Sequence, residues 1–141
     1  LKRICKYGSE TGQRILLENL NFEPEHAEVH YMAHNIKETK LYFDEIPAEE
    51  LGWAFTANHS HLVPEGINGF LDTFGIDRIG EVRLADNHGE YEVHLIPGEG
   101  NINFSNLFAR LENDGYKGHY SMAYGSDDER IKSRKQLSML V

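Results

Sequence analysis

The sequence predicts an α/β fold built around a parallel sheet. Apolar runs of strand length alternate with segments whose apolar residues recur every three or four positions, as on the buried face of a helix. The predicted order is one leading helix followed by four strand–helix units, which favours parallel strands joined by right-handed crossovers. Polar side chains follow the strands, at the end where such sheets usually carry their sites. The pattern fits a small open sheet and half of an eight-stranded barrel equally well.

The first half of the chain contains the leading helix and the first two predicted strands. Residues 1–9 have apolar residues at helical spacing, and the apolar run at 14–20 has the length of a short buried strand. Pro24 fits the first turn of a helix, which we expect over 25–40 because four apolar residues there fall on one face. The second strand is expected over the apolar run at 51–58.

The second half predicts the remaining strands and helices. Apolar residues at helical spacing indicate a helix over 64–75 that ends on a glycine, and the third strand is expected over 79–86. A further helix over 104–114 shows the same spacing and also stops before a glycine. The fourth strand is expected over 118–125, and Asp127 is predicted to cap a last helix that reaches about residue 140.

Composition places the chain among ordinary soluble globular proteins. With 141 residues, of which 40% are hydrophobic and 26% charged, it has room for one domain, which we expect to span 1–141. No apolar run has the length of a membrane span. The single cysteine cannot form an internal disulfide, so we expect a reducing, cytoplasmic location. The net charge of −9 repels a phosphate backbone, which argues against a nucleic-acid partner.

The segment 79–100 holds the densest group of reactive side chains. It begins with the third predicted strand and continues into a glycine-rich loop. Its ionisable residues include Arg83, Asp86, Glu92, His94 and Glu99. Polar residues at the carboxyl end of a strand, followed by such a loop, are typical of a β/α site. The alternative is an ordinary surface loop with a tight turn.

Four strand-end segments resemble one known family when taken in order. They are ENL at 18–20, TANHSHL at 56–62, VRLADN at 82–87 with HLIPGEGNINF at 94–104, and GYKGHYSMAYG at 115–125. These segments are similar to the C-terminal half of the xylose isomerase-like TIM barrels, which include sugar isomerases, epimerases and dehydratases as well as apurinic endonucleases. The resemblance covers nearly the whole chain. It implies a TIM-barrel type fold in which this chain supplies about four strand–helix units, the C-terminal half barrel.

The resemblance also implies a divalent metal, Mn²⁺, Mg²⁺, Co²⁺ or Zn²⁺, that binds an enediolate or activates a hydroxyl. Glu18 matches the ligand that the family carries on its fifth strand. The three other positions of that metal site hold Thr56, Arg83 and Ala123. Threonine is a poor ligand, alanine is none, and arginine is a fixed cation that repels a metal. A site that works without metal is therefore the alternative.

A second metal position is better matched. His59 matches the histidine of the family's D-x-x-H motif. Glu92 and His94 match the acidic-x-His pair that binds a second metal in members with several metal ions. Two imidazoles and a carboxylate suit Zn²⁺, Mn²⁺ or Fe²⁺. Together with Glu18 these are the predicted metal ligands, and the alternative for His94 is that it braces its loop through hydrogen bonds.

Three of these residues are also predicted to be catalytic. Glu18 would act as general base and His59 as acid or proton shuttle. The guanidinium of Arg83 would bind a carboxylate or phosphate and stabilise an enolate. The alternative for Arg83 is a salt bridge to Glu18 or Asp86. Four strand-end residues are expected to bind substrate: Asn58, Asp86, Asn87 and Glu99.

These residues favour an enzyme, an isomerase, epimerase or dehydratase that acts on a sugar or sugar acid by proton transfer next to a carbonyl. The alternative is a catalytically degenerate barrel that binds a sugar acid or serves as a structural subunit, as the replaced ligands would suggest. Half a barrel exposes the edges of a parallel sheet. We therefore expect a homo-oligomer, or a longer polypeptide whose N-terminal half is missing here.

Overall fold

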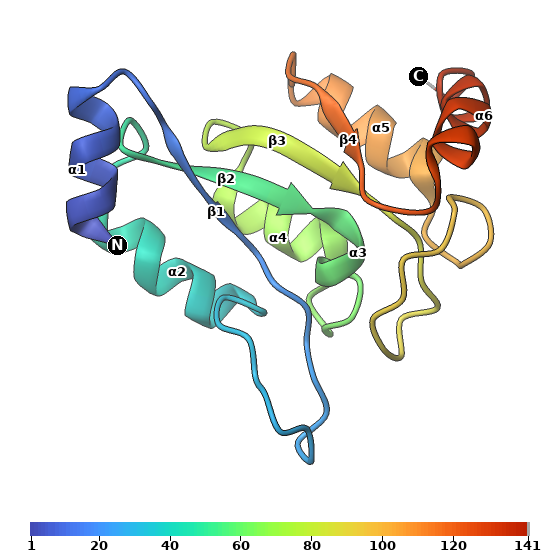
Figure 1. The fold of residues 1–141 in the computed structure, drawn as a ribbon, viewed down its shortest axis with the longest axis horizontal. Coiled ribbons are helices and arrows are strands. Elements are labelled where there is room, and N and C mark those ends of the chain that lie inside the picture. Colours follow the sequence, from blue (N-terminus) through green and yellow to red (C-terminus); the bar gives the residue numbers. More distant parts are fainter. Residues whose placement is uncertain (141) are drawn as a thin grey trace.

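A four-stranded parallel sheet lies at the centre of the protein, with its strands in the order β1-β2-β3-β4 (Figure 1). The structure is a computed structural model and describes residues 1–140. The strands are β1 (Ile15–Glu18), β2 (Leu51–Thr56), β3 (Ile79–Leu84) and β4 (Tyr120–Met122). All neighbouring pairs are parallel, and helices connect them. The predicted α/β alternation is confirmed, and the sequential strand order is that of half a TIM barrel.

The helices pack their apolar side chains against one face of this sheet. They are α1 (Lys2–Glu10), α2 (Ile36–Glu45), α3 (Ala57–Ser60), α4 (Gly66–Phe74), α5 (Phe104–Asn113) and α6 (Asp127–Leu137). Trp53 of β2 lies against Phe43 of α2 and Phe70 of α4, with ring centroids 6.0 and 6.2 Å apart. Burying an aromatic side chain of this size contributes about 1.5–3 kcal/mol. The opposite face of the sheet lies open in Figure 1.

The predicted helix over 25–40 is wrong in its first part. Helix α2 begins only after Asn35, whose side chain accepts a hydrogen bond of 2.9 Å from the backbone N–H of Glu38. Ala33 has φ 60°, a left-handed conformation that a helix does not contain. The preceding residues form a long loop instead (Figure 1), and Met32, expected on a buried helix face, is 64% exposed. A capping signal thus outweighed apolar spacing.

Two smaller differences concern the end of the chain. Ser126, not Asp127, caps α6: its hydroxyl accepts from the backbone N–H of Glu129, and the Glu129 side chain accepts from the Ser126 N–H. This reciprocal pair is a capping box. The fourth strand is three residues long, shorter than predicted. Within residues 1–140, no helix combines the length and apolarity needed to cross a membrane.

An irregularity in β3 decides which of its side chains face the open side of the sheet. Adjacent residues of β2 pair with Ile79 and Glu81, so Gly80 is passed over in the register. Such a bulge shifts the alternation of faces by one residue. Ile79 therefore packs in the core with Val82, while Glu81 and Arg83 point to the other side.

Candidate functional site

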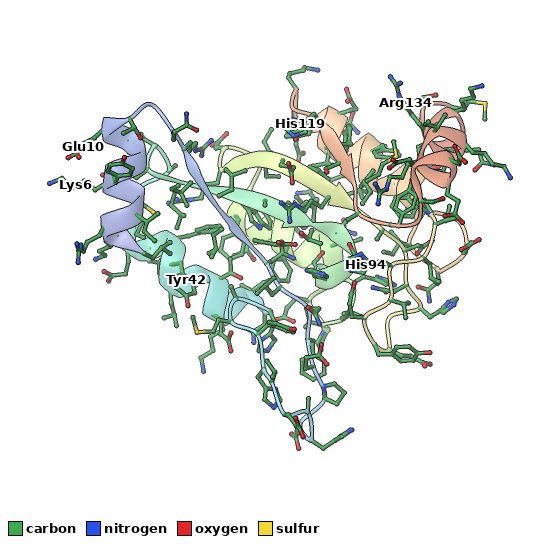
Figure 2. The ribbon with its side chains drawn as sticks, viewed as in Figure 1. Lys6, Glu10, Tyr42, His94, His119 and Arg134 are labelled. Atoms are coloured by element: carbon green, nitrogen blue, oxygen red, sulfur yellow. The ribbon has the colours of Figure 1, made fainter. Side chains whose placement is uncertain are left out.

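Reactive side chains converge at the carboxyl ends of β1, β2 and β3. Glu18 ends β1, His59 lies in α3 directly after β2, and Arg83 is near the end of β3. Arg83 Nη1 is 2.7 Å from Glu18 Oε2, and His59 Nδ1 is 3.7 Å from Glu18 Oε1. The loop after β3 brings His94 beside α3 (Figure 2), with its ring centroid 6.2 Å from that of His59. The residues predicted to be catalytic thus lie next to the predicted metal ligands.

His59, Glu92 and His94 form a compact triad whose ligand atoms all lie within 4.8 Å of one another. Glu92 Oε1 is 2.9 Å from His94 Nε2 and 3.6 Å from His59 Nε2. On the other side of each ring, Nδ1 donates to a backbone carbonyl, that of Asn19 for His59 and that of Ala123 for His94. Because a carbonyl only accepts, both Nδ1 atoms carry a proton, and both Nε2 atoms are directed at Glu92.

The donor set of this triad fits a divalent cation. His59 is buried, Glu92 half-buried and His94 exposed, so one side of the triad is open to solvent. Glu92 Oε2 is buried and has no hydrogen-bond partner among residues 1–140. Buried polar atoms are normally paired, so an unpaired carboxylate oxygen here is consistent with a metal ligand. Asn58 Nδ2 donates to the other oxygen, Oε1, at 2.7 Å and thereby orients the carboxylate. Two imidazoles and one carboxylate are a donor set that borderline metals such as Zn²⁺ or Mn²⁺ accept.

Glu18, the fourth predicted ligand, is held by protein donors. Its Oε1 accepts from the Thr56 hydroxyl and its Oε2 from Arg83 Nη1, both at 2.7 Å. Glu18 is outside the triad, although its position next to His59 keeps it within the same site. Of the two salt bridges considered for Arg83, the structure shows the one to Glu18 and not the one to Asp86.

Arg83 has a second carboxylate partner, Glu81, that was not singled out from the sequence. Arg83 Nε donates to Glu81 Oε1, and the exposed His119 is 3.3 Å from the other oxygen. The hydrogen bond from Arg83 lowers the pKa of Glu81, and the same bond raises the pKa of Arg83. The available signal was their spacing, because residues two apart on a strand share a face.

Asp86 is fully buried, and its carboxylate accepts hydrogen bonds from the backbone of its own loop. Its Oδ1 accepts from the N–H groups of Asn87 and Ile102, and its Oδ2 from those of Gly98 and Gly100, at 2.9–3.1 Å. A side chain on Gly100 would collide with the Asp86 carboxylate. Asp86 was expected to bind substrate, but all four hydrogen bonds of its carboxylate are to backbone groups of the loop.

The other residues expected to bind substrate lie in different surroundings. Asn58 and Asn87 are fully buried, and Asn87 Nδ2 donates to the Asn58 carbonyl at 2.8 Å. This hydrogen bond connects α3 to the start of the loop after β3. Glu99 is exposed and lines a groove of 1110 Å³ between its loop and α6, and the triad residues do not line that groove.

Asn19 is a buried residue of the site whose role the sequence did not indicate. Its Oδ1 accepts from the Thr56 N–H and from Trp53 Nε1, at 3.0 and 2.9 Å, and its Nδ2 donates to the Thr56 carbonyl at 2.9 Å. The side-chain amide thus replaces one step of strand pairing beyond the end of β1. Its own carbonyl holds His59 at 2.8 Å. The only sequence signal was a polar residue that ends an apolar run.

Comparison with known proteins agrees with this geometry. The sequence profile of the family described as xylose isomerase-like TIM barrel matches residues 1–140. The chain belongs to this family. The resemblance inferred from the strand-end segments is therefore confirmed, and the four-stranded sheet is the corresponding half of a xylose isomerase-like barrel.

Several members of the family are similar to this xylose isomerase-like chain. An uncharacterised protein of Methanocaldococcus jannaschii is 33% identical over 95 residues, 66% of this chain and 32% of that protein. The fructoselysine 3-epimerase of Escherichia coli O157:H7 is 24% identical over 119 residues, 84% of this chain and 41% of the enzyme. A crystal structure of a D-tagatose 3-epimerase-like protein superimposes with a TM-score of 0.82 at 25% identity, over 99% of this chain and 51% of that one. The chain thus spans about half or less of the length of these relatives.

Proposed function

We propose that this chain forms half of the active site of a sugar isomerase or epimerase that moves a proton on the carbon next to a carbonyl. The observation that carries the proposal is the triad, in which two tethered imidazoles and an oriented carboxylate converge where the strands end. The relatives named as sugar epimerases support the reaction class. The superposition with the D-tagatose 3-epimerase-like protein covers 99% of this chain and supports a shared fold.

We assign the triad residues to metal binding. With Nδ1 bound to Asn19 and Nε2 directed at the triad centre, His59 has no nitrogen left for proton transfer, so it serves as a ligand rather than as a shuttle. Glu92 and His94 complete the set. The chemistry that a bound divalent metal supplies is Lewis-acid polarisation of a carbonyl oxygen, which acidifies the neighbouring C–H.

Glu18 is the residue we assign to proton transfer. A carboxylate offers about four acceptor positions, and Glu18 uses two of them, towards Thr56 and Arg83. These two donors hold the carboxylate in one orientation, while its side chain stays 26% exposed and accessible to a substrate. A general base needs this combination of fixed direction and access.

The test combines metal binding with proton exchange. We expect purified protein to bind one Mn²⁺ or Zn²⁺ per chain by titration calorimetry, and His94→Ala to weaken that binding. D-Tagatose or D-fructose incubated with the metal-loaded protein in D₂O should gain deuterium next to the carbonyl, as followed by NMR. Glu18→Gln should bind metal normally but lose the exchange. Absence of stoichiometric metal together with absence of exchange would overturn the proposal.

A non-catalytic sugar-binding relative is the second candidate. The ion pair of Arg83 with Glu18 favours it, because it places a fixed cation next to the residue that matches the family's first metal ligand. Metal and sugar binding without deuterium exchange would support this candidate over the enzyme.

We further propose that four more strands complete the barrel. Both edge strands, β1 and β4, are only half-buried along their length, and exposed edges of a sheet are normally covered. The additional strands come from a second copy or from another part of a longer polypeptide. Light scattering of the purified chain tests the proposal: a dimer supports the second copy, whereas a stable, monodisperse monomer overturns the need for closure.

A further inference from the structure

Arg83 presents a guanidinium whose two bidentate edges are both in use. One edge of a guanidinium consists of Nε and one terminal nitrogen, and the other consists of the two terminal nitrogens. Glu81 accepts from Nε, and Glu18 accepts from Nη1. Each edge has therefore lost one of its two donors to a carboxylate of the protein. A carboxylate or phosphate from solution cannot form the paired hydrogen bonds that make arginine a strong anion receptor.

Glu81 owes this contact to the backbone of β3. The bulge at Gly80 lets Glu81 and Arg83 share the open face of the sheet while Ile79 and Val82 stay in the core. The side chain of Glu81 is 20% exposed and that of Arg83 38%, so the pair lies at the surface that a substrate would contact. The contact lowers the pKa of Glu81, which keeps this carboxylate charged.

The charges around the pair also disfavour an anion. Three carboxylates, Glu18, Glu81 and Glu92, lie at this end of the sheet, and the one Lys or Arg side chain within residues 1–140 that pairs with any of them is Arg83, which contacts Glu18 and Glu81. Without a bound metal, a negatively charged sugar would meet more carboxylate than guanidinium. An uncharged sugar meets no such penalty and can use the same groups as hydrogen-bond acceptors.

We propose that Glu81 is a specificity-determining residue that masks Arg83 and thereby excludes sugar acids and sugar phosphates in favour of uncharged sugars. The identity of the substrate as a sugar rests on the proposed function, whereas the masking of Arg83 does not. Removal of Glu81 frees the Nε edge of Arg83, and the site becomes an anion receptor.

The experiment uses inorganic phosphate as the probe, titrated into the protein with EDTA present so that no metal competes for the anion. NMR shifts of the arginine Nε–H report binding. Glu81→Ala should bind phosphate about 10- to 100-fold more tightly than the unchanged protein, the range expected for charge-assisted hydrogen bonds. The double variant Glu81→Ala with Arg83→Gln should lose that gain. The control is Glu90→Ala, which removes the same charge from an exposed loop residue and should change phosphate affinity by less than about twofold.

The same titration with D-fructose 6-phosphate and D-fructose measures specificity. The unchanged protein should bind D-fructose 6-phosphate no more tightly than D-fructose. Glu81→Ala should bind D-fructose 6-phosphate more tightly than D-fructose. Equal phosphate affinity with and without Glu81, or a gain that survives the loss of Arg83, would overturn the proposal. If Glu81→Ala does not fold, Glu81→Met keeps a similar side-chain size without an acceptor for Arg83 Nε and should show the same gain, and no gain there is equally decisive. Absence of deuterium exchange would count against the proposed isomerase or epimerase activity and not against the masking of Arg83, because the phosphate titration requires neither metal nor turnover.

Discussion

The two charged clusters at the strand ends balance their charges in opposite ways. In the triad, the Nε2 atoms of His59 and His94 lie 3.6 and 2.9 Å from one carboxylate oxygen of Glu92, and no Lys or Arg of residues 1–140 pairs with that carboxylate. In the neighbouring cluster, Arg83 is a cation supplied by the chain itself and is shared by Glu18 and Glu81. On the proposed assignment, the first cluster takes its cation from solution, whereas the chain itself supplies the cation of the second. The comparison shows that carboxylates of one type can differ in whether the chain provides their counter-charge.

The largest expected effect concerns the loop that carries Glu92 and His94. Asp86→Ala leaves four backbone N–H groups without their acceptor, so we expect the free energy of unfolding to fall by about 3–5 kcal/mol in urea denaturation. Asp86→Asn should lower the free energy of unfolding almost as much. The asparagine amide has one acceptor oxygen, and its NH₂ group would face the backbone N–H groups that bind the second oxygen of Asp86. A loss below about 1 kcal/mol in both variants would show that the loop is held by other contacts.

The next effect separates the two clusters directly. Glu92→Ala should weaken Mn²⁺ or Zn²⁺ binding by at least about 100-fold, since it removes the only carboxylate of the triad. Glu18→Ala, which removes a carboxylate of the Arg83 cluster, should change metal affinity by less than about fivefold. Calorimetric titration of both variants gives the comparison. Equal losses would mean that the two clusters form a single metal site.

A smaller effect is expected from Asn19→Ala. The substitution removes the amide that links β1 to Thr56 and Trp53, so we expect a loss of about 1–3 kcal/mol in the free energy of unfolding. The backbone carbonyl that holds His59 remains, and metal affinity should therefore fall by less than about tenfold. A large loss of metal binding with little loss of stability would instead assign the side chain to the site itself.

The smallest effect is a pH dependence from Glu81. Its pKa in the folded protein lies below the ordinary value of 4.5, chiefly because of the hydrogen bond from Arg83. The ionised carboxylate therefore contributes stability above pH 4.5, and this contribution is lost as the pH falls through the lowered folded pKa. Because both partners are partly exposed, we expect less than about 1 kcal/mol. Urea denaturation between pH 5 and 3 should show a shallower decline for Glu81→Gln than for the unchanged protein.

Particular residues show why the site was harder to predict than the sheet. Glu18, His59, Glu92 and His94 could be selected from the sequence because each stands at or beyond a strand end and matches a known strand-end segment. Asn19 could not, because its partners lie elsewhere in the chain, and the two-residue spacing of Glu81 and Arg83 did not show which face of the sheet they share. Trp53 is 34 residues from Asn19, and nothing local indicates that contact. The loop at 21–34 misled the prediction for the same reason, since apolar spacing is measured without knowing whether a core is near.

By itself, the sequence determined the alternation of strands and helices, because hydrophobic periodicity and capping signals act between residues a few positions apart. It also determined the family through its strand-end segments. Only the tertiary structure decided which charges neutralise each other. Arg83 meets Glu18 across 65 residues, and the bulge at Gly80 turns Glu81 to the same face. Contacts of this kind depend on register between distant strands, and a shift of one residue would send each of these side chains to the opposite face of the sheet.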